Sequence, residues 1–166
     1  MKTIKLVLLL SFITNLLFSQ KFEMPENYKL ETAGDYKLYE QDVIRGINWL
    51  LETPVNEQPA KRKEVNTFLL KWISGSPHVH IMIKSSVVTF IETSPDLLMV
   101  FMCGWTKYSI ESKQFDDNVG GSLAGIEAVV AFYTKNAELQ VKDKNVEKYI
   151  KLKSKGKLKE YLEKNA

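Results

Sequence analysis

The side chains best suited to bind a ligand are gathered in one short segment, from Gly104 to Tyr108. The segment joins an aromatic ring, a hydroxyl, an ammonium group and a phenol directly after a wholly apolar stretch. Trp105 and Tyr108 are three residues apart and would share one face of a helix, whereas Lys107 would face elsewhere. Two interpretations follow. Either a central helix leaves the core here, or Trp105, Lys107 and Tyr108 form the rim of a site for a small ligand or a partner.

The two histidines of the chain, His78 and His80, are separated by one residue. On a strand their side chains would point to the same side and could supply two metal ligands. A metal site needs a third ligand and usually a fourth, and the spacing selects none of Glu92, Asp96 and Glu111. We therefore expect no metal site, with His78 and His80 as the only candidate ligands.

The sequence contains no arrangement of side chains that is typical of catalysis. No serine lies in a Gly-X-Ser-X-Gly elbow, and the adjacent carboxylates Asp116 and Asp117 would not face each other on a helix. Cys103 is the only cysteine, so no intramolecular disulfide can form, and it lies in the most apolar stretch of the chain. We expect a buried, structural thiol at Cys103, no catalytic residue and no cofactor.

The beginning of the chain has the order of a secretory signal peptide. Lys2 and Lys5 precede a run of thirteen mainly apolar residues, and Ser19 offers a small residue before the cut. A membrane anchor would need about 20 apolar residues, whereas this run is shorter and no stop-transfer cluster follows it. Residues 1–19 are therefore predicted to be a cleaved signal peptide that directs the protein to the periplasm or the medium.

Charge is distributed unevenly between the body of the chain and its C-terminal end. Residues 141–166 hold nine lysines and four acidic residues, a net charge of +5, whereas residues 21–140 hold 12 basic and 16 acidic residues, a net charge of −4. The lysines alternate with apolar residues, which is typical of the solvent face of amphipathic helices. The alternative is contact with an anionic surface such as membrane headgroups. No nucleic-acid-binding motif occurs, and we expect no nucleic-acid partner.

The pattern of apolar residues predicts an all-α protein. We expect an irregular arm at residues 20–34 and then a single compact bundle of five or six helices over residues 35–166. Apolar residues recur at steps of three and four from a cap at Asp35 to about residue 53. Pro59 can begin the second helix, which the glycine and proline at positions 75 and 77 end.

The middle of the chain is predicted to pass from an extended link into helices. Residues 77–84 alternate apolar and polar side chains as a strand would, but no partner strand is evident. We therefore expect an extended link here and a helix over residues 85–93. Residues 94–96, Ser-Pro-Asp, can then start a new helix. Residues 97–105 are apolar on every side and predict a helix at the centre of the bundle.

Three glycines are expected to set the closest contact between helices. Gly104 lies at the end of the apolar stretch, and Gly121 and Gly125 lie on the small-residue side of the next helix. Because glycine lets another backbone approach closely, we expect Gly104 to pack against Gly121 or Gly125. Two further helices, beginning near Asp143 and after Gly156, complete the bundle.

Several segments resemble those of a group of small secreted bacterial all-helical proteins that has no assigned activity. The segments are KWISGSP at residues 71–77, FMCGWTKY at residues 101–108, KDK at residues 142–144 and IKL at residues 150–152. The resemblance covers most of the chain after the predicted signal peptide. It implies export and a helical fold, and it implies no catalytic residue.

Three functional hypotheses remain. The first is an exported, non-enzymatic helical protein that binds another envelope component. The second is a carrier of a small apolar or lipid-like ligand, with a cavity beneath Trp105 and Tyr108. The third is a hydrolase with an unrecognised site. A closed apolar cavity would favour the carrier, a flat apolar patch the partner, and a polar cleft with converging carboxylates the enzyme.

Overall fold

The computed structural model describes residues 22–139 and 141–166, so the predicted signal peptide at residues 1–19 lies outside the described part of the chain. Within that part every regular element is a helix and no strand occurs, which confirms the all-α prediction. The α-helices are α1 (Ala33–Leu38), α2 (Glu40–Glu52), α3 (Pro59–Gly75), α4 (Leu97–Ser112), α5 (Asn118–Lys135), α6 (Lys144–Ser154) and α7 (Leu158–Glu163), with a short 3₁₀ helix, η1 (Ala137–Leu139), after α5. No helix in the described residues is both long and apolar enough to cross a membrane.

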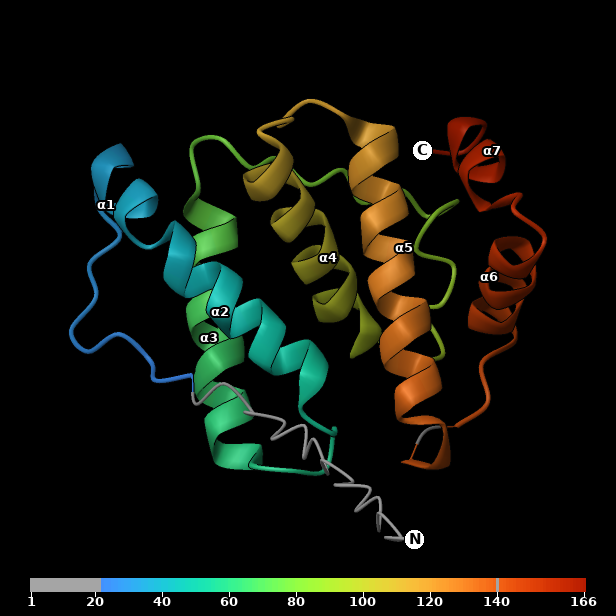
Figure 1. Cartoon of the computed structure of the whole chain (residues 1–166), viewed down its shortest axis with the longest axis horizontal. Coiled ribbons are helices and arrows are strands. Elements are labelled where there is room, and N and C mark those ends of the chain that lie inside the picture. The colour runs from blue at the N-terminus through green and yellow to red at the C-terminus, as the bar shows by residue number, and fades with distance from the viewer. Residues whose placement is uncertain (1–21, 140) are drawn as a thin grey trace, which may run out of the picture.

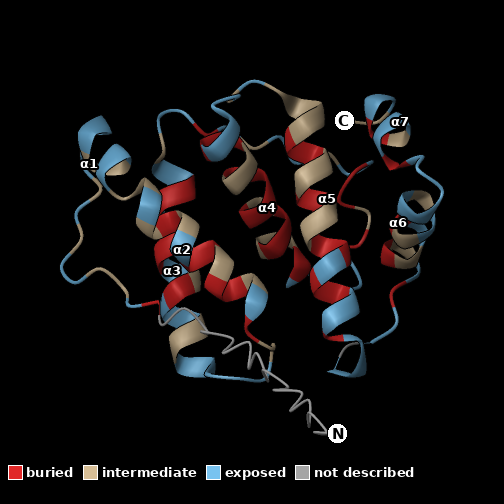
Figure 2. Cartoon of the chain, in the orientation of Figure 1, coloured by how far each residue is buried: buried red, intermediate tan, exposed pale blue. Residues whose placement is uncertain are grey.

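The helix pair α4 and α5 forms the centre of the molecule. Figure 1 shows the two helices side by side, with α1, α2 and α3 on one side and α6 and α7 on the other. Helices α2 and α3 pack against α4, whereas α6 and α7 pack against α5. Figure 2 shows that buried residues dominate the middle of α4, because this helix is covered from both sides.

The helix predicted from residue 35 to about residue 53 is divided, which is one reason why the described residues form seven α-helices rather than five or six. The backbone departs from helical geometry at Tyr39, with φ −92° and ψ 4°, between α1 and α2. Asp35 is not the cap that the sequence predicts but the third residue of α1. Its carboxylate accepts from the Thr32 amide (2.8 Å) and the Thr32 hydroxyl accepts from the Asp35 amide (3.3 Å), which completes a capping box.

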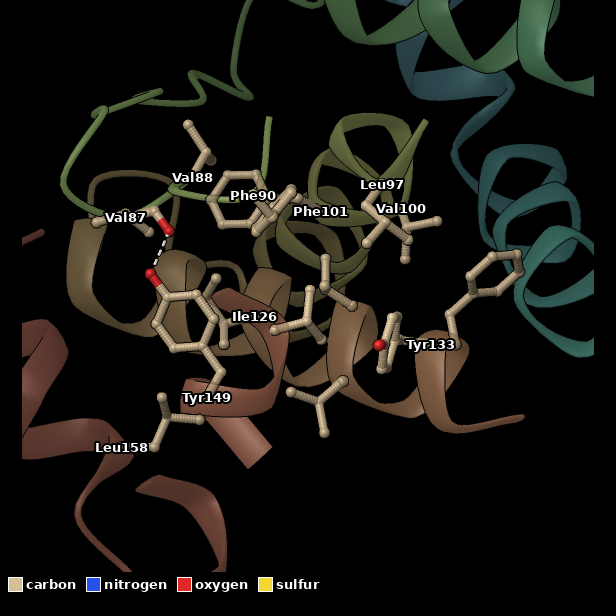
Figure 3. Close-up of a cluster of buried hydrophobic side chains, with 14 of the residues drawn as sticks. Val87, Val88, Phe90, Leu97, Val100, Phe101, Ile126, Tyr133, Tyr149 and Leu158 are labelled. Atoms are coloured by element: carbon tan, nitrogen blue, oxygen red, sulfur yellow. Dashed lines mark hydrogen bonds between the residues drawn. The ribbon is translucent and has the colours of Figure 1, made fainter. Parts of the chain in front are cut away.

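Residues 85–93, predicted to be helical, form a series of turns instead. The carbonyl of Val87 accepts a hydrogen bond from the buried Tyr149 hydroxyl of α6 (2.6 Å, Figure 3). The Ile91 amide donates to the Val88 carbonyl (3.0 Å) and so closes a turn, not a helical ring, at this point. Branched side chains at positions 87–89 also weaken helix formation. A contact with a distant helix therefore decides the local structure.

Two clusters of buried apolar side chains lie on either side of α4. The larger cluster joins α4, α5, the turns at residues 87–90, α6 and α7, and Figure 3 shows Phe90, Phe101 and Tyr149 among its side chains. The second cluster joins α2, α3 and the other side of α4. The arm contributes Phe22 to the second cluster, and Tyr28 lies edge-on to Phe68 of α3 at 4.9 Å between ring centroids. The non-helical arm is thereby attached to the bundle.

Helices α4 and α5 approach most closely at their glycines. A Cβ atom added to Gly104 would lie 2.6 Å from the carbonyl oxygen of Ala124 and 3.0 Å from the Cα atom of Gly125. A Cβ atom added to Gly121 would lie 2.3 Å from the Trp105 indole. Gly125 is thus the glycine that lies beside Gly104, whereas Gly121 makes room for a ring. Both contacts need the absence of a side chain.

Candidate functional site

An open apolar groove lies between the first half of α3 and the first turns of α4. Its volume is about 720 Å³, which is in the usual range for small-molecule sites. Leu50 and Val55 at the end of α2 and Phe132 of α5 also contribute to its lining. Most of the lining is apolar, and the polar residues are confined to a few positions. The described residues therefore offer a groove that is neither a closed cavity nor a flat patch.

The groove exists because two helices present apolar residues that their neighbours do not cover. Helix α3 buries one stripe of side chains that includes Phe68 and Trp72. Leu70 lies off that stripe and is 48% exposed. The first nine residues of α4 are apolar on all sides. Met99 and Met102 in this stretch line the groove and stay only partly buried. Methionine adapts its shape to irregular contacts, which suits a lining of this kind.

Arg62 fixes the end of the groove formed by α2 and α3. Its Nη2 atom donates to the carbonyl of Thr53 (2.6 Å) and to that of Pro54 (2.9 Å), and Nη1 donates to the carbonyl of Leu50 (3.2 Å). The guanidinium also lies over the Trp49 ring, 5.7 Å from its centroid. Partial burial lowers the pKa of Arg62, but arginine stays charged because its ordinary pKa is above about 12. A cation is therefore held at the C-terminal end of α2, where the helix dipole favours it.

Two polar atoms in the groove lining lack partners. The Nε atom of Arg62 and the Oδ1 atom of Asn66 are buried and have no hydrogen-bond partner among the described residues. They belong to residues one helical turn apart on the same face of α3. Buried polar atoms are normally paired. Here both atoms are covered by the protein, so a molecule in the groove does not reach them in this conformation. The hydroxyl oxygens of Thr106 and Ser109, which do not line the groove, are unpaired in the same way within the described chain.

The groove carries more positive than negative charge. Lys63 is exposed and, among the described residues, has no carboxylate within ion-pair distance, unlike Lys113, which pairs with Glu40 at 3.3 Å. Asp96, which precedes α4, is the only acidic residue among those that line the groove in the described chain. With Arg62, the lining therefore has two cations and one anion.

A second, smaller pocket of about 480 Å³ lies beside Tyr108 and Asp117. The Tyr108 hydroxyl donates to Oδ2 of Asp117 (2.6 Å), and the Gly120 amide donates to Oδ1 (2.8 Å). The bond from Tyr108 lowers the pKa of Asp117, and the same bond raises the pKa of Tyr108. Asp117 therefore caps α5, and Tyr108 holds the capping carboxylate in place. Glu127 in the same lining pairs with Lys153 at 3.2 Å, and Lys159 and Glu163 complete the charged residues of the described lining.

The three residues of the predicted rim do not share one surface. Trp105 is 1% exposed and packs against Gly121 in the core. Lys107 points to α2, where its Nζ atom donates to Oδ1 of Asn48 (2.7 Å). Tyr108 alone lines a pocket, the smaller one at the start of α5. The spacing indicated correctly that Trp105 and Tyr108 lie on one side of the helix, but it did not show that α5 covers the tryptophan.

The histidines and the cysteine lie apart from both pockets. His78 and His80 are exposed, and the His78 ring is 5.9 Å from the Phe115 ring. No group of three or more His, Cys, Asp or Glu residues in the described part of the chain is placed to hold a metal. Cys103 is fully buried in the second cluster, and burial raises the pKa of its thiol, which disfavours a reactive thiolate.

No family model, curated protein or solved structure matches the chain. The resemblance to small secreted helical proteins therefore stays a prediction. The functional proposal therefore rests on the fold and on the groove.

The sequence analysis did not identify the residues of the groove. Arg62, Lys63 and Asn66 look like ordinary solvent-facing residues of an amphipathic helix. Leu70 carried a usable signal, because a leucine outside the apolar stripe of a helix is left exposed unless a partner covers it. The other signal was the stretch at residues 97–105, which begins α4 and is apolar on every side. The neighbouring helices do not cover all of its first turns.

Proposed function

We propose that the protein is an exported, non-enzymatic binding protein that holds a small apolar molecule in the groove between α3 and α4. The observation that carries this proposal is the open groove of about 720 Å³, whose lining is mainly apolar with a few polar residues, most of them on α3. Small-molecule sites combine this kind of apolar lining with a few polar groups that fix orientation. Export is supported by the signal-peptide composition of residues 1–19.

The size of the groove favours a small molecule over a protein. Its volume of about 720 Å³ lies within the usual range of small-molecule sites. The enzyme hypothesis has less support, because the carboxylate and phenol of the smaller pocket are bonded to each other. The carrier hypothesis thus agrees best with the geometry, with the site at α3 and α4 and not beneath Trp105.

Binding of Nile red tests the proposal, because this neutral dye fluoresces strongly only in an apolar site. We expect the purified protein to bind the dye and Leu70→Glu to weaken binding, since a charge would then lie in the groove lining. Leu38→Glu is the matched control: Leu38 is also an exposed leucine, at 70%, and lies on α1 away from the groove. Equal dye binding by the parent and Leu70→Glu, or none by the parent, would overturn the proposal.

A second candidate function is contact with an anionic envelope surface through α6 and α7. Among the described lysines of residues 141–166, Lys153 and Lys164 form ion pairs and Lys148 lies over the Tyr161 ring at 4.3 Å. The other six have no carboxylate within ion-pair distance: Lys142, Lys144, Lys151, Lys155, Lys157 and Lys159.

Sedimentation with lipid vesicles tests this second candidate. We expect binding to vesicles that contain anionic lipid, little binding to neutral vesicles, and weaker binding at high salt. The double variant Lys151→Gln, Lys155→Gln should bind less, whereas Lys29→Gln, Lys37→Gln, which changes the same charge elsewhere, should not. Equal binding to neutral and anionic vesicles would contradict the hypothesis.

A further inference from the structure

The polar residues of the groove are concentrated on α3, and this arrangement points to the chemistry of the ligand. Arg62, Lys63 and Asn66 lie within the first two turns of α3, whereas the lining beyond them, at Leu70, Met99 and Met102, is apolar. We propose that the ligand is a single-chain amphiphile with a carboxylate head, which lies at Lys63 and Arg62 while its chain follows the apolar lining. This inference rests on the proposed function and adds the class of ligand.

The α3 end of the groove is complementary to a carboxylate in charge. The Lys63 ammonium has no ion-pair partner among the described residues. Arg62 is held in place by three backbone carbonyls, so its charge is fixed beside Lys63. A carboxylate would pair directly with the Lys63 ammonium and lie in the positive potential of Arg62.

The one acidic residue among the described residues of the lining does not lie on α3. Asp96 belongs to the segment before α4, and its charge directs an anionic head toward α3.

The length of the lining agrees with a medium acyl chain. From Lys63, where the head group is placed, to Leu70 is seven residues of α3, a rise of about 10 Å. Met99 and Met102 of α4 and Phe132 of α5 add further apolar lining for the chain. One such chain also fits a volume of about 720 Å³ within the normal range of ligand sites.

Displacement of Nile red by dodecanoate and by its methyl ester, both below the micelle threshold, tests the ligand class. The ester keeps the chain and loses the charge, so we expect dodecanoate to displace the dye at lower concentration. Lys63→Gln should weaken dodecanoate binding about fivefold, the upper range for a partly exposed ion pair, and should leave the ester unchanged. Asp96→Asn should strengthen dodecanoate binding, because it removes the anion of the lining. Lys37→Gln, on α1, is the matched control and should change neither.

The outcomes separate this inference from the proposed function. If the ester displaces the dye as well as the acid and Lys63→Gln has no effect, the carboxylate head is overturned while the apolar groove remains supported. If the protein does not bind Nile red, the proposed function fails and this inference fails with it. If Lys63→Gln weakens acid and ester equally, lysine acts through packing and the assignment of the head group is also overturned.

Discussion

The two sides of α4 are built in opposite ways. Toward α5 the helix is in backbone contact, because Gly104 and Gly125 leave no side chains between the two helices. Toward α3 the first turns of the same helix leave an open groove. The residue types are similarly apolar on both sides. Apolar composition alone therefore does not decide whether a helix face becomes core or site; the shape of the neighbour does.

Polar contacts fasten both the closed side of α4, which faces α5, and the open side, which faces α3 across the groove. Tyr149 donates to the Val87 carbonyl, and the buried Asp143 accepts from Thr93 and from Ser94 (2.7 Å), so α6 holds the turns at residues 87–94 onto the pair α4 and α5. On the open side Arg62 donates to three carbonyls at the end of α2, and Lys107 of α4 donates to Asn48 of α2. The two sides therefore differ in how closely the neighbouring backbone approaches α4 and not in the presence of polar contacts.

The largest expected effect is that of Gly104→Val on the closed side. Even the Cβ atom would lie 2.6 Å from a backbone oxygen of α5 and 2.7 Å from the Cβ atom of Ala128, and backbone cannot yield as a flexible side chain can. We expect a loss of at least about 3 kcal/mol in the free energy of unfolding, at the upper end for overpacked cores. Thermal denaturation measures it.

Gly34→Val is the control for this substitution. A Cβ atom at Gly34 meets nothing closer than the Thr32 hydroxyl at 3.7 Å, so the same change of residue is tested where space exists. If both valine variants melt at the same temperature, α4 and α5 are not in close contact in solution and the comparison of the two sides fails.

Asp143→Ala is expected to have the next largest effect. Asp143 is 2% exposed, and its carboxylate accepts from two hydroxyls and from the amides of Asn145 (2.8 Å) and Val146 (3.3 Å). Removal leaves these donors without their acceptor, which should cost about 2–3 kcal/mol. Urea denaturation at neutral pH measures the loss, with Asp116→Ala, an exposed aspartate, as the control. Equal losses for the two variants would show that the carboxylate does not join α6 to the turns.

The same carboxylate predicts a pH dependence. Burial acts to raise the pKa of Asp143, but its four hydrogen bonds outweigh burial, so the pKa is lowered overall. A group with a lowered pKa in the folded state stabilises the protein above its unfolded pKa of about 3.9. That contribution is lost as pH falls through the folded value. The difference in stability between the parent and Asp143→Ala should therefore be constant above about pH 4 and shrink below it; a difference that grows in acid would contradict the assignment.

Much of the closed side could be predicted from the sequence. The capping aspartates at 117 and 143 and the small residues of α5 are local signals, and a glycine against a glycine follows from helical spacing. The turns at residues 85–93 could not be predicted in this way, because Tyr149, 62 residues from Val87, fixes their backbone. The groove was missed for a related reason: it depends on how far α3 stands from α4, and periodicity shows which residues share a face but not what covers that face.

Cys103 tests whether the core beneath the groove is sealed. The residue is fully buried in the second cluster, on the side of α4 that faces α2 and α3, although it does not line the groove. We expect a thiol reagent to modify it only after unfolding, since burial raises the thiol pKa. Cys103→Ala should cost about 1 kcal/mol, as small core truncations do. Rapid labelling of the native protein would show that the groove extends into the core, and the open side would then be larger than described.

The smallest effect is expected on the open side itself, for the stability of Leu70→Glu. Leu70 is 48% exposed on α3 and lines the groove, and glutamate has a helix propensity close to that of leucine. The free energy of unfolding should change by no more than about 0.5 kcal/mol, as at ordinary surface positions. Leu38→Glu on α1 should behave alike. The same Leu70→Glu variant is expected to bind the dye more weakly, so one substitution tests both stability and binding. If the variant keeps its stability and loses dye binding, the open groove contributes to binding and not to the stability of the fold. If Leu70→Glu instead unfolds the protein by more than about 2 kcal/mol, a loss typical of the core, then α3 closes on α4 in solution and the open side is core after all.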